Sequence, residues 1–226
     1  MKYPPHTSTR YDAELNAARA SVMQMGELVE RQFRSAIESL ATGDLMAIDR
    51  VIDDGYAVNA KEIEIDECCA SLLVRRQPTA NDLRLVAAII KIINDLERIG
   101  DEAENIARFS RLIAQKQLTP PPRYRQTKYM ADIALGMLTS ALRAFDDLDS
   151  ASAKKIERKD TLIDEEFRSI LRHLVAYMME ETSELSTTLN VVLVARAIEC
   201  IGDHAKNISE YVIYMIEGRE VRNFTM

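Results

Sequence analysis

The chain has 226 residues, of which 47% are hydrophobic and 29% are charged, a balance typical of globular proteins and not of disordered ones. Its formal net charge of -7 disfavours nucleic acid as a partner, because the phosphate backbone demands a surplus of Lys and Arg. Only 7 Gly and 6 Pro are present, so the turns of a many-stranded sheet are scarce and long helices are expected.

The sequence shows no sign of export or of a membrane span. Residues 1–6 lack the apolar stretch of a secretory signal. Apolar runs such as Val86–Ile90 and Val191–Ala195 end at a Lys or an Arg and are too short to cross a bilayer. The 3 Cys residues form neither a disulfide framework nor a C-x-x-C metal site, which favours reduced thiols. We therefore expect a cytoplasmic protein.

The first half of the chain predicts three helices. Apolar residues recur at helical spacing from about Thr9 to Ala41, and after a break at Gly43 the same periodicity runs from Leu45 until Pro78 ends it. Thr79 followed by Asp82 is typical of a helix start, and this third helix continues to about Ala114.

The second half predicts three more helices. Residues 117–122 contain three consecutive prolines, which cannot continue a helix, so they form the expected connector between a first bundle, 1–116, and a second, 123–226. Helical patterns then run from about Arg123 to Asp147, from Ala151 to Glu181 and from Ser183 to Glu217.

An internal repeat relates the two halves. The segments 97–107 and 199–209 lie 102 residues apart and share seven of eleven residues, and the segments 36–40 and 141–145 correspond at an offset of 105. The sequence therefore predicts an all-α protein of six helices, arranged as two tandem three-helix bundles.

Each copy carries an acidic stripe on its last helix. Glu97 and Asp101 are one helical turn apart, and Glu199 and Asp203 repeat the spacing. Like charges so placed repel each other by about 0.2–0.5 kcal/mol, which a bound cation would offset. Carboxylate oxygens suit hard cations such as Mg, Mn or Fe, and Zn also accepts them. Further candidate metal ligands on the same helix faces and on the middle helices are Asp160, Asp164, Asn59, Asn105 and Asn207.

Two alternatives to a metal-dependent binding module remain open. The acids could line a solvated face or pair with nearby Lys and Arg, which describes a plain helical scaffold. A metal-dependent enzyme is the other alternative, but no nucleophile or general base stands beside the acids, and the Glu-x-x-His spacing of di-iron bundles is missing, so no catalytic residue is assigned.

His204, next to Asp203, is interpreted as a surface histidine and not as a ligand. Gly100 and Gly202 are expected to allow close helix packing.

The motifs closely resemble the PhoU family of bacterial phosphate-signalling proteins. The resemblance rests on residues 77–84, on 95–101 with its second copy 199–203, and on the tail 211–222, and it spans nearly the whole chain. It implies a non-catalytic, homodimeric, metal-binding helical regulator of phosphate uptake. Such proteins keep the phosphate-starvation (Pho) regulon silent, with the transporter ATPase subunit PstB and the sensor histidine kinase PhoR as partners and the membrane reached only through them.

The resemblance also assigns the metal residues and marks two departures. The family's metal motifs map onto Glu97 with Asp101 and Glu199 with Asp203, and the companion pair on the middle helix maps onto Asp160 and Asp164. Gly55 stands where the family usually has Asp, which weakens the expected first site unless Asp53, Asp54 or Glu62 substitutes. Cys200 replaces the Arg that follows Glu97 in the first copy, so we expect a more acidic field around the second motif.

Overall fold

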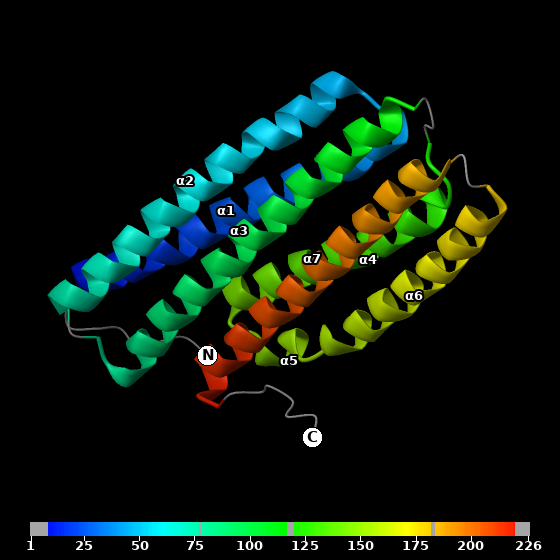
Figure 1. The fold of residues 1–226 in the computed structure, drawn as a ribbon. Coiled ribbons are helices and arrows are strands. Elements are labelled where there is room, and N and C mark those ends of the chain that lie inside the picture. Colours follow the sequence, from blue (N-terminus) through cyan, green and yellow to red (C-terminus); the bar gives the residue numbers. More distant parts are fainter. Residues whose placement is uncertain (1–8, 77, 117–119, 182–183, 220–226) are drawn as a thin grey trace.

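A computed structural model describes residues 9–76, 78–116, 120–181 and 184–219. Its helices are α1 (Thr9–Thr42), α2 (Leu45–Arg76), α3 (Ala80–Ala114), α4 (Tyr124–Asp147), α5 (Ser150–Ala153), α6 (Glu157–Glu180) and α7 (Leu185–Glu217). Helices α1, α2 and α3 form one bundle, and α4, α6 and α7 form the other (Figure 1). The predicted all-α fold of two three-helix bundles is confirmed.

The helix bounds follow local signals in the sequence. Gly43 adopts a left-handed backbone conformation with φ of 68°, and α1 ends there. Glycine adopts this conformation at low free-energy cost because it has no Cβ. At the start of α3 the Asp82 carboxylate accepts the Thr79 backbone N–H at 3.2 Å and its hydroxyl at 2.6 Å. The connector residues 117–119 and the expected helix start at Ser183 lie outside the described residues, as does the tail beyond 219.

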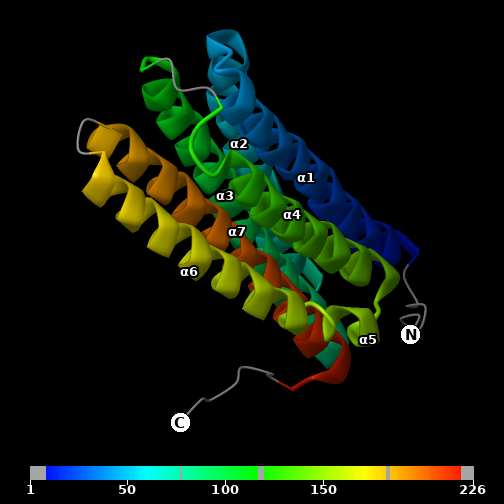
Figure 2. The same ribbon diagram turned by 90° about the vertical axis from the view of Figure 1, so that its right-hand side faces the viewer.

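The prediction of one continuous helix from Ala151 to Glu181 is wrong. The chain forms the short α5, turns through Lys154–Ile156 and then begins α6 (Figure 2). The Asp149 carboxylate caps α5 by accepting the amides of Ala151 and Ser152 at 2.9 and 3.1 Å. This capped turn places the first residues of α6 beside the end of α4.

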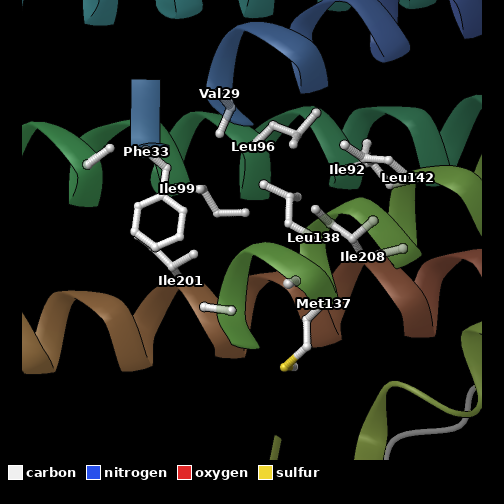
Figure 3. Packing of buried hydrophobic residues seen from close by; sticks show 14 of the residues in the cluster. Val29, Phe33, Ile92, Leu96, Ile99, Met137, Leu138, Leu142, Ile201 and Ile208 are labelled. Atoms are coloured by element: carbon white, nitrogen blue, oxygen red, sulfur yellow. The ribbon is translucent and has the colours of Figure 1, made fainter. Parts of the chain in front are cut away.

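The two bundles share one continuous core. Side chains from α1, α3, α4 and α7 meet in it, among them Phe33, Leu96, Leu138 and Ile201 (Figure 3). The bundles pack against each other through this shared core. The division of the chain into two domains, 1–116 and 123–226, therefore stays a prediction.

The helices α3 and α7 form the largest interface of any helix pair in the described part of the chain. They run antiparallel, because Lys91 lies 5.3 Å from the Tyr211 ring while Asp95, one turn further along α3, contacts His204, nearly two turns earlier in α7. The equivalent helices α3 and α7 therefore pack against each other in opposite directions. This arrangement corresponds to an approximate two-fold rotation between the two copies.

One described helix, α7, passes a test for a membrane span by length and composition alone. Half of its most apolar stretch is buried inside the structure, as expected for the core helix of a bundle.

The two helices α6 and α7 approach closely at Gly202, as the sequence predicted for a packing glycine. A Cβ at this position would lie 2.6 Å from the Cδ1 atom of Ile163, which is buried. At Gly136, in contrast, a Cβ would make an ordinary contact of 3.8 Å with Lys159 Nζ.

We therefore predict that Gly202→Ala lowers the free energy of unfolding by about 1–2 kcal/mol, because overpacking outweighs the gain in helix propensity. The matched Gly136→Ala variant should raise it by about 0.5–1 kcal/mol. Urea unfolding followed by circular dichroism measures both. Equal stabilisation of both variants would show that α6 yields freely at Gly202.

Candidate functional site

The acidic face of the second bundle brings four predicted carboxylates together. Glu199 and Asp203 of α7 face Asp160 and Asp164 of α6 across the contact between these helices. Burial raises the pKa of Glu199, and the charges of Asp203 and Asp164 raise it further. Burial, Asp160 and Asp164 likewise raise the pKa of Asp203. Glu199 and Asp203 are therefore harder to ionise because neighbouring carboxylates are present.

Basic side chains partly neutralise this face. Lys206 Nζ donates to Asp160 at 2.6 Å, the Arg196 guanidinium pairs with Glu199, and Arg168 lies 3.4 Å from Asp164. Arg196, one turn before Glu199, thus supplies the positive neighbour that the Cys200 substitution was expected to remove. Cys200 does replace an Arg, but Arg196 offsets part of the lost charge, and the more acidic field stays a prediction.

The donor chemistry of the four carboxylates fits a hard divalent cation, which would relieve their mutual repulsion. The side-chain arrangement is that of an ion-paired face. Within the described ranges, no group of three or more His, Cys, Asp and Glu side chains is positioned to hold a metal ion. Metal binding at this face therefore requires the acids to turn from Lys206 and Arg196 toward the ion.

The first bundle holds a poorer version of the site. Burial, Asp101 and Glu62 raise the pKa of Glu97, which identifies Glu62 as the acid that α2 contributes. Burial raises the pKa of Asp101, with a further effect of Glu104. Asn59, the counterpart of Asp164, is exposed and makes no described contact with these carboxylates.

The region around Gly55 shows why the first copy differs. A Cβ at Gly55 would lie 3.1 Å from a Glu104 carboxylate oxygen and 3.6 Å from the side-chain nitrogen of Gln32. Gln32 is fully buried and donates to the Val51 carbonyl at 3.0 Å. The space beside Gly55 is thus bordered by a buried amide and an acid that pairs with Arg108. In the second copy Met137 stands at the position of Gln32.

Two of the candidate asparagines point into other contacts. Asn207 donates to Asp95 at 3.3 Å, and Asn105 donates to Glu102 at 3.3 Å. Asp95 is buried with 6% exposure and also lies 2.6 Å from His204 Nδ1. The interpretation of His204 as a surface histidine is therefore wrong, since its side chain is largely buried and links the two bundles through Asp95.

Sequence reasoning missed Asp95 as a member of this region. The available signal was its position among Ile92, Ile93 and Leu96 on the apolar face of α3, where an acid needs a buried partner. The partner could not be named without the packing of α3 on α7.

Taken together, the fold and the site define an all-α protein made of a duplicated three-helix bundle, with paired carboxylates at equivalent positions of its two long packed helices. The family model of the PhoU domain matches residues 22–110 and again 127–212. The chain belongs to the PhoU family.

Relatives and solved structures agree. A phosphate-specific transport system accessory protein PhoU homolog of Burkholderia sp is 42% identical over 97% of this chain and 94% of its own. The PhoU of Escherichia coli strain K12, under the same accessory-protein name, is 38% identical over 96% and 90%. The crystal structure of PhoU from Pseudomonas aeruginosa superposes with a TM-score of 0.89 at 38% identity, covering 92% of this chain and all of that one.

The raised pKa values give a prediction for metal-free protein. A carboxylate whose pKa is higher in the folded than in the unfolded state opposes folding once it ionises, so its cost appears as the pH rises above about 4. Asp203→Asn should therefore raise the free energy of unfolding at pH 7 by about 0.5 kcal/mol, and the gain should vanish near pH 4. Urea titrations in the presence of a chelator measure this.

The control for this prediction is Glu165→Gln, which removes an exposed acid of α6 that has no ion pair among the described residues. It should change stability by less than about 0.3 kcal/mol. If Asp203→Asn is instead destabilising at pH 7, attraction to Arg196 and Lys206 outweighs the repulsion between carboxylates.

Proposed function

We propose that this chain is a regulatory accessory protein of phosphate uptake and signalling that holds metal on its second acidic face. The single observation that carries the proposal is the cluster of Asp160, Asp164, Glu199 and Asp203, on a fold of the PhoU family. The accessory role in phosphate-specific transport comes from the names of relatives that match nearly the whole chain.

In this proposal the protein is a cytoplasmic homodimer without catalytic activity. It acts as a negative regulator of the Pho regulon by connecting PstB, the transporter ATPase subunit, with PhoR, the sensor kinase. It meets the membrane only through these partners. The ion, of the Mg, Mn, Fe or Zn type, fixes the relative position of α6 and α7.

An exposed apolar stripe supports a role in protein contacts. Leu185, Leu189 and Leu193 follow each other at one-turn intervals on α7 and are 51%, 50% and 37% exposed. Exposed apolar side chains gathered in a row on a helix are typical of a binding surface. The stripe leads along α7 toward Glu199, so a change at the acidic face can reach it through one rigid helix.

The second copy is the stronger metal site in this account. Its middle helix provides two acids, whereas the first copy has Gly55 and Asn59 at those positions. Glu97 and Asp101 with Glu62 form at most a weaker cation site.

The experiment combines metal content with transcription. In the native host, deleting the gene should switch on a phosphate-starvation promoter even in phosphate-rich medium, and the wild-type chain should silence it again. Asp160→Asn combined with Glu199→Gln removes two of the four proposed ligands, so this variant should lose the bound metal, measured by elemental analysis of dialysed protein, together with the silencing.

The matched control is Glu97→Gln combined with Asp101→Asn, which removes the same two charges from the first copy. It should keep most of the metal. A promoter that stays silent after the deletion contradicts the regulatory role, whereas unchanged metal content in the second-copy variant contradicts only the metal site.

A further inference from the structure

A pocket of about 330 Å³ lies where α4, the α5–α6 turn and the start of α6 meet. It is on the second bundle and shares no residue with the acidic face. Its volume falls at the lower end of the range of small-molecule sites, about 300–1,000 Å³. Its lining includes three basic side chains from three segments: Arg143 of α4, Lys155 of the turn after α5 and Lys159 of the first turn of α6.

The charged groups of these three side chains form no hydrogen bond or close ion pair with any residue in the described part of the chain. Other lysines of the same bundle behave differently. Lys154 pairs with Glu217 at 2.5 Å, Lys206 pairs with Asp160, and Lys128, which lines a separate pocket of about 170 Å³, pairs with Asp132 at 3.1 Å. Gathering unpaired cations costs free energy that an anion would recover.

The acids of the pocket neutralise it only in part. Asp149 is committed to capping α5, and hydrogen bonds from Ser152 hold its pKa below the usual range, which the charge of Lys155 helps to lower. Asp147 is exposed and forms no ion pair within the described ranges. Three cations against two carboxylates leave the pocket net positive on a chain of net charge -7.

Backbone and hydroxyl groups add to the anion-binding character. The helix α6 begins at this pocket, and the positive end of its dipole favours an anion there. The Ser140 and Ser152 hydroxyls also line the space. Ser140 donates to the Gly136 carbonyl at 2.5 Å, which leaves its oxygen free to accept.

The internal repeat provides a comparison within the same molecule. At an offset of 105, the first copy has Glu38, Arg50 and Asp54 at the positions of Arg143, Lys155 and Lys159. Two of the three cations are thus replaced by acids, so the repeated fold does not by itself require a basic cluster here. The basic cluster is a property of the second copy alone.

We propose that this pocket binds a small phosphate-bearing anion, either inorganic phosphate or a phosphate ester, through Arg143, Lys155 and Lys159. Guanidinium and ammonium groups form charge-assisted hydrogen bonds with phosphate oxygens. The apolar lining from Ala144 and Ile156 accommodates the organic part of an ester. The site is independent of metal and of the proposed partners.

The test is isothermal titration calorimetry on the full chain, with inorganic phosphate, pyrophosphate, AMP and, for comparison, sulfate. A chelator keeps the protein free of metal, and salt of about 0.15 M screens weak surface attraction. Arg143→Gln combined with Lys159→Gln should weaken binding of the phosphate probes at least about tenfold. Tighter binding of AMP than of phosphate identifies an ester as the ligand, and the reverse order identifies the free anion.

The control removes two other cations from exposed positions that have no described partner. Arg31→Gln combined with Arg50→Gln makes the same change in net charge and should alter affinity by less than about twofold. Circular dichroism establishes that both variants fold. Absence of binding by every phosphate probe to the wild type overturns the proposal, as does equal weakening by the two variants.

Discussion

Asp95 is a buried carboxylate in the middle of α3 that contacts His204 and Asn207 of α7. An acid in this position would be strongly destabilising without hydrogen-bonding partners, so α3 and α7 must pack in the register that supplies them. Together with the shared apolar core, this contact sets how the two bundles lie relative to each other. The same two helices carry the acidic pairs, Glu97 with Asp101 on α3 and Glu199 with Asp203 on α7.

The two copies of the repeat carry different polar and charged side chains at equivalent positions. The approximate two-fold rotation would place identical groups at equivalent positions, yet Ala197 stands at the position of Asp95 and Glu102 at that of His204. The buried bridge therefore forms on one side of the α3–α7 contact. The second copy likewise has the four facing carboxylates and the basic pocket, whereas the first copy has Gln32 and Gly55 in its interior.

Periodicity and repeats were sufficient to predict most of the fold. Apolar spacing predicts the six long helices, and the repeated segment around Gly100 and Gly202 identifies the two bundles as copies of each other. The break between α5 and α6 could not be predicted in this way. It depends on the Asp149 cap and on the burial of Ala153 and Ile156, while the residues around them keep a helical pattern.

The facing carboxylates of the candidate site could be predicted from the sequence, and Lys206 could be named as a possible counterion, but the individual ion pairs could not be predicted. One-turn spacing places Asp160 with Asp164 and Glu199 with Asp203 on common faces, and the packing of α6 on α7 brings the pairs together. Which base approaches which acid depends on side-chain packing between helices, so the pairs of Lys206 with Asp160 and of Asp95 with His204 emerge only from the structure. The basic pocket is formed by three segments that meet only in the folded chain, so no single sequence motif predicts it.

The claim that Asp95 and His204 hold the two bundles as one unit is tested most directly by a double-mutant cycle. Urea unfolding of the wild type, Asp95→Ala, His204→Ala and the double variant yields the coupling free energy. The account predicts a single unfolding transition in the wild type and a coupling of at least about 1 kcal/mol. Additive effects within about 0.3 kcal/mol, or two separate transitions in the wild type, would contradict it.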